Sequence, residues 1–538
     1  MPHRNARSLA LGGIRQQLYN AQMSKFSRDL YRKKLETLLG RADDDTFLAL
    51  AWSVSALQSD QIDAASRHMH FRQEAVGAEL GSGNHVPPWM LETLINEFLR
   101  APKERRISGR PYKVLDCTHM DQMLGALHLL NKLENAEYGI FRDRINILDD
   151  MRRMNHRQFE WQREVLSPAR IYRSSILYAD GAADQFLRTK HGLGVHDLSL
   201  AGFALFSVLH SEIAIHGPQS LPEIGLTADI YQRALGIISQ PIEQAKEQAR
   251  KVRKFGQNTA YLPSVLRRFP IIKIDGVRDV SLAPLPALII RRVTSGVSID
   301  FFGAPENVFS EIAERFESYS SALLARILPN YSIVREFSYG SKKLQKQSPD
   351  ILVSLDEKIQ MVVECKSTGM TYDAKFSEDP ATTEKYKIAD IGKGIFQIWR
   401  FFAHARKGLV QNQECHSDGF GVLLTLEDWF TMSRQPILKM FENAHKRCED
   451  AAEEILDCDK RPIVLAWVED IEYLQRACHE AQFFEVMQAA HSKKYRGWFL
   501  PGLADELFPD AKAQNPYAFA EEFGKQSWWK KISALEPQ

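Results

Sequence analysis

The sequence lacks features that mark several specialised classes of protein. Its six cysteines form no Cys-x-x-Cys pair, which argues against a disulfide framework or a structural zinc site and fits a reducing compartment. The most apolar helical stretch, residues 201–215, is interrupted by His210 and Glu212 and falls short of the ~20 residues that span a membrane. The start of the chain has too short an apolar stretch for a signal peptide. We therefore expect a cytoplasmic protein without a membrane anchor.

The chain also lacks an excess of either charge. Its 69 Lys and Arg residues against 68 Asp and Glu residues give a net charge of +1, so no global attraction to nucleic acid or to a membrane exists. Any site for a polyanion must be a local patch. Hydrophobic residues make up 44% and charged residues 25%, as in ordinary globular proteins. At 538 residues, the chain is expected to form two to four domains.

Motifs of several enzyme classes are absent. The glycine-rich segment 77–85 contains no Gly-Lys-Ser/Thr for a nucleotide-binding loop, and no Gly-x-Ser-x-Gly elbow occurs. His210-x-Glu212 is not followed by the Pro-Cys-x-x-Cys of zinc deaminases. His196-Asp197 stands without the further ligands that a metal-dependent hydrolase of this type needs. We interpret these histidines as non-catalytic.

What the sequence does contain is a change of pattern along its length. Residues 1–258 repeat apolar residues at three- and four-residue spacing, which predicts an all-helical domain for recognition or interaction. Residues 259–304 are rich in β-branched residues between prolines and glycines, which predicts a small β-rich connector with strands at 267–276 and 287–303. The expected fold class is therefore α+β with several domains.

Residues 305–480 predict an α/β domain with a mixed sheet and helices on its faces. The expected elements are a helix over 307–328, strands over 331–339, 350–355 and 359–368, a helix over 387–408, and strands over 421–427 and 462–470. Residues 481–538 predict a C-terminal extension of helix and loop.

Three charged residues stand at the ends of two of these strands. Asp350 opens one strand and Glu364 ends the next, so a tight turn around Asp356 and Glu357 would bring both carboxylates to one edge of the sheet. Lys366 follows Glu364 by two residues and leaves the same face of the strand.

The residue between them, Cys365, points its side chain to the opposite face, although its backbone carbonyl can still face the carboxylates. Two carboxylates, a carbonyl and water suit Mg²⁺. Lys366 could orient or deprotonate a water molecule, or stabilise a pentavalent phosphorane. An alternative is that Asp350 is a turn residue and that Glu364 and Lys366 form an exposed pair of little consequence. The strand is too apolar for a solvent-exposed edge, which favours a site.

The motif Pro349-Asp350…Glu364-Cys365-Lys366 resembles that of the PD-(D/E)xK nuclease superfamily, which includes restriction endonucleases and RecB-like exonucleases. The order of helices and strands around the motif is similar as well. The resemblance extends over about residues 306–475 and implies a restriction-endonuclease-like domain. It carries no information about residues 1–258.

Two further segments support the resemblance. Phe316-Glu317-x-Tyr319 is similar to the first helix of Mrr-type restriction nucleases, in which an additional acidic residue helps to hold metal. Gln397-Ile-Trp-Arg-Phe401 is similar to the Gln-x-x-x-Tyr element of RecB-like members, with Phe in place of Tyr.

The resemblance implies a role for each matching residue. Mg²⁺ or Mn²⁺ would be held by Asp350, Glu364, the backbone carbonyl of Cys365 and Glu317. Lys366 would be the catalytic lysine, and Gln397 would contact the substrate or a metal-bound water. Glu311 and Glu314 lie on the same predicted helix and remain alternatives to Glu317.

Basic residues near the motif suggest how a nucleic acid could bind. Lys393, Gln397 and Arg400 fall at i, i+4 and i+7 on one stripe of the predicted helix. Lys393 and Arg400 are therefore candidate contacts to a phosphate backbone, although a solvated face would show the same pattern. The basic clusters at 103–106, 152–153 and 291–292 are more typical of solvated surface.

The expected function is thus a divalent-metal-dependent nuclease that hydrolyses phosphodiester bonds. The resemblance implies DNA rather than RNA as the substrate, an endonuclease activity, and a role in restriction or antiviral defence. One alternative is a binding or assembly protein with an inactive nuclease fold. Another is a nuclease subunit that works only within a complex. A homodimer would supply two sites for cutting both strands of a duplex.

Overall fold

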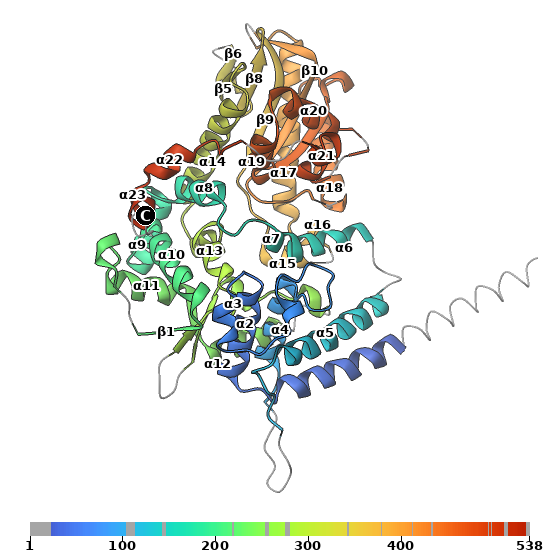
Figure 1. Cartoon of the computed structure of the whole chain (residues 1–538). Coiled ribbons are helices and arrows are strands. Elements are labelled where there is room, and N and C mark those ends of the chain that lie inside the picture. Colours follow the sequence, from blue (N-terminus) through green and yellow to red (C-terminus); the bar gives the residue numbers. More distant parts are fainter. Residues whose placement is uncertain are drawn as a thin grey trace, which may run out of the picture.

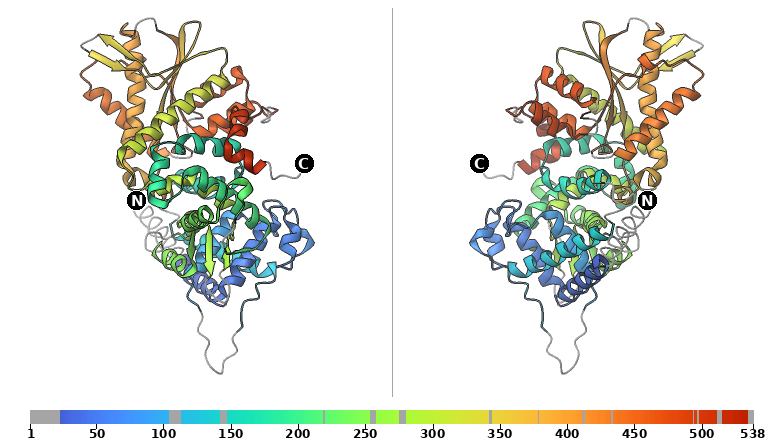
Figure 2. Two further views of the ribbon diagram at one scale, coloured as in Figure 1. Left: turned by 90° about the vertical axis from the view of Figure 1, so that its left-hand side faces the viewer. Right: turned by 90° about the vertical axis from the view of Figure 1, so that its right-hand side faces the viewer.

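The chain forms a mostly helical lobe and a lobe built on a five-stranded sheet, which stand one above the other in all three views (Figures 1 and 2). The computed structural model describes residues 23–103, 113–141, 147–217, 220–252, 258–274, 280–341, 344–377, 379–410, 413–431, 434–492, 494–495, 498–510 and 515–533. We call residues 23–301 the helical lobe and residues 305–510 the sheet lobe.

The helical lobe contains helices of 3 to 22 residues. They are α2 (Asp44–Leu57), α3 (Ile62–Ser66), α4 (Pro88–Arg100), α5 (Met120–Phe141), α6 (Ile147–Met154), a π-helix (Asn155–Phe159), α7 (Glu160–Gln162), α8 (Pro168–Tyr178), α9 (Ala182–His191), α10 (Val195–Ser211), α11 (Ala228–Ile238), α12 (Ile242–Val252) and α13 (Ala287–Val293). Pro88 begins α4, as expected from its fixed φ, and Gly192 ends α9 with a φ of 75°.

A four-stranded sheet lies within this lobe and corrects the prediction that residues 1–258 are all helical. Its strands are ordered β1 (Ala214–His216), β4 (Val280–Leu282), β3 (Ile271–Ile274) and β2 (Ser239–Pro241). β1 and β2 are three residues each, too short to show the alternation that identifies a strand from sequence. They are strands only because β3 and β4, far along the chain, pair with them.

The predicted strand over 287–303 is also wrong, because this segment forms α13 and a 3₁₀ helix over Ser295–Phe301. From sequence alone, a short run of mostly apolar residues is compatible with a buried helix as well as with a buried strand. Here the run packs against α10 at Gly202, where an added Cβ would lie 2.5 Å from Val293 Cγ1. The two helices therefore meet with no space for a side chain at that point.

The sheet of the sheet lobe has the order β11-β10-β9-β8-β5. Its strands are β5 (Ser332–Arg335), β8 (Ile351–Leu355), β9 (Lys358–Lys366), β10 (Glu414–Thr425) and β11 (Ile463–Trp467). β5, β8 and β9 are antiparallel neighbours, whereas β9, β10 and β11 are parallel. The predicted mixed sheet is confirmed. The predicted strand over 331–339 is split, because a separate hairpin of β6 (Ser338–Ser341) and β7 (Leu344–Gln347) begins at residue 338.

The turn between β8 and β9 is the predicted one. Asp356 and Glu357 have φ values of 50° and 62°, which both central residues of a type I′ hairpin require. Leu355 pairs with Lys358 across it. This two-residue loop sets the register of the hairpin and therefore the relative positions of its far ends.

Helices cover both faces of the sheet (Figure 1). α14 (Glu306–Ile327) shares a hydrophobic cluster with Val363 and Cys365 of β9. α17 (Lys385–Arg406) shares another with Val362. The remaining helices of the described chain are α15 (Tyr372–Phe376), α16 (Pro380–Thr383), α18 (Arg434–Asp450), α19 (Val468–Ala477), α20 (Glu480–Ala490), α21 (Leu500–Leu507), α22 (Ala520–Lys525) and α23 (Ser527–Ser533).

The two lobes share a hydrophobic core. One cluster of buried side chains runs from α8 to α11, through α14, into the sheet and on to α21. The last helices return to the helical lobe, where the Trp528 ring lies 5.3 Å from that of Phe203. Among the described residues no single helix is long and apolar enough to cross a membrane, and α9 with α10 passes that test only as a pair bent by 67°.

Two of the basic clusters interpreted as solvated surface are buried instead. The guanidinium of Arg152 donates to the carbonyls of Ala374, Lys375 and Ser377 beyond β9, and that of Arg292 donates to both oxygens of Asp300. The prediction failed because charges on adjacent residues do not reveal which distant acceptors will meet them. In the cluster at 103–106, residues 104–106 lie outside the described residues.

Candidate active site

The strand ends bring Asp350 and Glu364 to the same edge of the sheet. Ile351 pairs with Val363, so the residue before β8 lies beside the last residues of β9. The backbone N–H of Cys365 donates to Asp350 Oδ2 at 2.6 Å. N–H and C=O of one strand residue point to the same neighbouring strand, so the carbonyl of Cys365 is directed to the Asp350 side as well.

Glu364 is a buried carboxylate with one oxygen engaged. The residue is only 2% exposed, and Lys366 Nζ donates to its Oε1 at 3.0 Å. Its Oε2 is buried and has no hydrogen-bond partner. Burial, reinforced by the charge of Asp350 and opposed by Lys366, raises the pKa of Glu364 to about 8. A buried carboxylate with a free oxygen is costly without a cation.

Of the three candidate glutamates on α14, Glu317 is the one beside this pair. Burial, then the charge of Asp350, raises its pKa to about 7. Glu311 instead accepts from the backbone N–H of Ala182 at 2.7 Å, and Glu314 is exposed. We call Glu317, Asp350 and Glu364 the carboxylate cluster.

Lys366 is held in its charged form within this cluster. Burial alone would lower the pKa of Lys366, but the charges of Glu364 and Asp390 outweigh burial and raise it. The Lys366 side chain is 15% exposed. The lysine is therefore a cationic hydrogen-bond donor at the surface of the cluster.

The structure adds residues that sequence reasoning missed. Arg335 ends β5, and its Nη2 lies 3.9 Å from Glu317 Oε2. The backbone N–H of the next residue, Glu336, donates to the carbonyl of Asp350 at 2.9 Å. β5 is antiparallel to β8, so the last residue of β5 and the residue after it meet the start of β8. The available signal was the charged pair Arg335-Glu336 within the strand predicted over 331–339.

Helix α17 covers the cluster at a glycine. A Cβ on Gly394 would lie 3.1 Å from Glu364 Cγ and 3.2 Å from Lys366 Cε. One turn further along, Gln397 has a buried Oε1 without a hydrogen-bond partner. Gln397 and Glu364 thus each leave a polar oxygen unsatisfied on facing elements.

The predicted basic stripe divides into two parts. Lys393 is exposed next to Gly394. Arg400 lies farther along α17, with its guanidinium 5.5 Å from the centre of the Phe396 ring. Its charge also contributes to lowering the pKa of Glu453. The distance along the helix between residues 394 and 400 is about 9 Å, so Arg400 is not brought to the carboxylate cluster itself.

The oxygen atoms at the strand ends are of the type that a hard divalent cation prefers. Burial is the largest cause that raises the pKa of each of the three carboxylates, and the charge of a neighbouring carboxylate adds to it in each case. A bound cation would offset both effects. Within the described ranges, no group of three or more His, Cys, Asp or Glu side chains is arranged to hold a metal ion. The predicted ligands are two carboxylates and a backbone carbonyl, completed by water or by Glu317.

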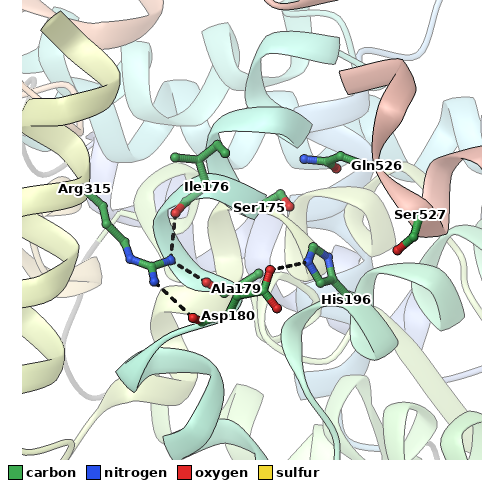
Figure 3. A pocket seen from close by; sticks show the side chains of 8 residues that line it. All are labelled: Ser175, Ile176, Ala179, Asp180, His196, Arg315, Gln526 and Ser527. Atoms are coloured by element: carbon green, nitrogen blue, oxygen red, sulfur yellow. Dashed lines mark hydrogen bonds and ion pairs between the residues drawn. The ribbon is translucent and has the colours of Figure 1, made fainter. Parts of the chain in front are cut away.

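A separate cavity of about 290 Å³ lies between α8, α10, α14 and the start of α23 (Figure 3). His196 Nε2 lies 3.2 Å from Asp180 Oδ2 there, and Arg315 points to the carbonyls of Ile176, Ala179 and Asp180. Arg315 and Glu317 are two residues apart on α14 and so leave nearly opposite sides of the helix. The cavity therefore shares no residue with the carboxylate cluster.

Comparison of the chain with protein-family models, with curated proteins and with solved structures found no match.

Proposed function

We propose that the chain is a divalent-metal-dependent nuclease with a restriction-endonuclease-like domain. The observation that carries this proposal is the buried Glu364, whose free Oε2 lies in a cluster with Asp350 and Lys366 at the junction of two strand ends. The order α14, β5, β8, β9, α17 and β10, with β10 parallel to β9, supports the same proposal. It is the order that the resemblance to the PD-(D/E)xK superfamily implies.

The proposed reaction is hydrolysis of a phosphodiester. A water oxygen bonds to phosphorus while the P–O bond to the leaving group breaks, which yields a phosphate monoester and a free hydroxyl. Asp350, Glu364 and the carbonyl of Cys365 would hold Mg²⁺ or Mn²⁺, with Glu317 beside them. Bound there, the cation would polarise a phosphoryl oxygen and lower the pKa of a water molecule.

The charge on Lys366 bears on the role that we propose for it. The charges of Glu364 and Asp390 raise the pKa of Lys366, which favours a role as a protonated donor to a phosphate oxygen over a role as the base that deprotonates water. Preorganised cations of this kind stabilise the charge that develops in the transition state. Gln397, whose Oε1 is free, would orient the attacking water or a substrate group.

DNA is the proposed substrate, and restriction or antiviral defence the proposed role. The helical lobe, which shares a core with the sheet lobe, would provide recognition of the substrate or of a partner subunit. This assignment follows the resemblance of the motif to its superfamily.

The test is cleavage of supercoiled plasmid, linear duplex, single-stranded DNA and RNA in Mg²⁺, Mn²⁺ or EDTA. We expect metal-dependent cleavage by the wild type, loss of cleavage in Asp350→Ala and Lys366→Ala, and full activity in Asp418→Ala, a control carboxylate that is 78% exposed. No cleavage together with no metal-induced stabilisation would overturn the proposal in favour of an inactive nuclease fold. No cleavage with clear metal-induced stabilisation would point to a missing partner subunit.

A further inference from the structure

Helix α17 carries one continuous stripe that runs beyond the candidate site. Tyr386, Asp390, Lys393 and Gln397 follow each other at i, i+4, i+7 and i+11, and so lie along one side of the helix. Gln397 and the neighbouring Gly394 lie at the carboxylate cluster. The stripe therefore leads from the cluster toward the first turn of α17, where Tyr386 stands.

Tyr386 is 89% exposed, which is unusual for an aromatic ring placed near a buried polar cluster. Large aromatic side chains normally bury most of their surface. The residue before it, Lys385, is exposed, as is Lys393. A ring and two ammonium groups are thus presented to solvent on the same helix as Gln397.

The first turn of α17 is firmly fixed, so the ring is held on a rigid element. The backbone N–H of Thr371 donates to the buried carboxylate of Glu384 at 2.9 Å. Lys387 Nζ donates to the carbonyl of Gly369 at 2.8 Å. Both contacts join the start of α17 to the loop that follows Lys366. The backbone of Tyr386 consequently keeps a fixed position relative to Lys366.

The spacing along the stripe suits a strand of nucleic acid. Tyr386 and Gly394 are eight residues apart, a rise of about 12 Å. Stacked nucleotides of one strand are ~3.4 Å apart, so the ring lies a few nucleotides from the point where cleavage would occur. Lys393 is on the path between them. Asp390, the one acidic member of the stripe, has its charge partly balanced by Lys366.

We propose that Tyr386 stacks on an unpaired base of the substrate, and that Lys393 contacts the phosphate backbone between that base and the carboxylate cluster. The substrate class is a single-stranded stretch of nucleic acid, because an aromatic ring can stack only on a base whose face is not already covered by its neighbours. This inference rests on the proposed nuclease function.

Binding is measured separately from cleavage, with the full-length chain in EDTA. The probes are a fluorescently labelled 20-nucleotide single strand of mixed sequence, as DNA and as RNA, and the matching DNA duplex. The variants are Tyr386→Ala, Tyr386→Trp and Lys393→Ala. Phe302→Ala is the matched control, because Phe302 is 90% exposed but lies outside the stripe.

We expect Tyr386→Ala to weaken single-strand binding about 10- to 100-fold, in line with the contribution of one stacked base. Tyr386→Trp should retain binding, Lys393→Ala should weaken it with a smaller salt dependence, and Phe302→Ala should change nothing. An equal loss for duplex and single strand, or no loss in Tyr386→Ala, overturns the inference.

The outcomes also separate this inference from the proposed function. Metal-dependent cleavage by the wild type with unchanged binding in Tyr386→Ala removes the stacking role alone. Absence of both cleavage and binding removes both proposals. If Tyr386→Ala alters only the oligomeric state in size-exclusion chromatography, the exposed ring contacts a second copy of the chain and the inference is wrong.

Discussion

Gly394 of α17 lies directly against Glu364 of β9, with room for a hydrogen atom but not for a methyl group. A Cβ there would approach Glu364 Cγ to 3.1 Å and Leu423 Cδ1 to 2.8 Å. The helix that carries Gln397 and Lys393 can reach the carboxylate cluster only because this residue has no side chain. The close approach of α17 to the sheet thus depends on Gly394 at this point, as it does on Gly421 of β10, where a Cβ would lie 2.6 Å from Ile398 Cγ2.

Gly394→Ala should therefore reduce activity more than it reduces stability. The added methyl group must displace α17 or the two site side chains, and overpacking of this kind costs about 1–3 kcal/mol in free energy of unfolding. We expect at least a tenfold loss of cleavage rate in a variant that still folds, measured by cleavage kinetics and thermal melting.

Gly236→Ala is the control for helix propensity. Gly236 lies inside α11, and a Cβ there would meet no atom within 4 Å. This variant should gain up to about 1 kcal/mol of stability and keep its activity. Equal activity in Gly394→Ala and the wild type would contradict the geometry of the site.

Mg²⁺ or Mn²⁺ should stabilise the folded protein, because a cation would satisfy the free oxygen of Glu364. At a concentration 100-fold above the dissociation constant, the gain is about 2.7 kcal/mol. Glu364→Gln and Asp350→Asn should lose this gain, whereas Asp418→Asn should keep it. The measurement is the melting temperature against metal concentration, and a wild type indifferent to both metals would contradict the prediction.

Lys366→Met should abolish cleavage without abolishing metal binding. Loss of one preorganised charge in the transition state costs about 10²–10³ in rate, whereas the carboxylates and the carbonyl remain in place. The readouts are single-turnover cleavage and the metal-induced shift in melting temperature. Lys358→Met, at the exposed start of β9, is the control. Loss of both readouts in Lys366→Met would mean that the lysine organises the cluster and is not a separate catalytic group.

The junction of the lobes should make the protein sensitive to acid. His156 is buried among Asp428, Lys375, Arg152 and Glu160, and its pKa is lowered chiefly by burial. A histidine whose pKa is lowered from 6.5 to about 3 by folding takes up a proton on unfolding at pH values between those two. Its contribution to stability is therefore complete above pH 6.5 and is lost progressively as the pH falls below that value.

Denaturant titrations between pH 7.5 and pH 5 measure this effect. The free energy of unfolding of the wild type should decrease by up to about 1.4 kcal/mol per pH unit and per proton. His156→Gln should show a shallower decrease, and His128→Gln, at an exposed position, should match the wild type. Identical slopes for all three proteins would contradict the buried, neutral state of His156.

The sequence predicted those features of the candidate site that depend on residues close together in the chain. Alternation along β9 puts Glu364 and Lys366 on one face, and the two-residue turn at Asp356 and Glu357 fixes which residues are neighbours across the hairpin. The end of a strand and the turn of its hairpin are separated by few residues, so their relative positions can be predicted from the local sequence. The metal and the reaction remain predictions.

The other features of the site and fold depend on contacts between segments that are far apart in the sequence. Such contacts cannot be predicted from a local pattern of residues. The sequence left Glu311, Glu314 and Glu317 as alternatives, and only the packing of α14 between α9 and the sheet separates them. The apolar run at 287–303 became helical because α10 covers it. Burial of Arg152 likewise depended on carbonyls more than two hundred residues away. The sequence by itself determined which residues could form a site, and the tertiary structure decided which of them meet.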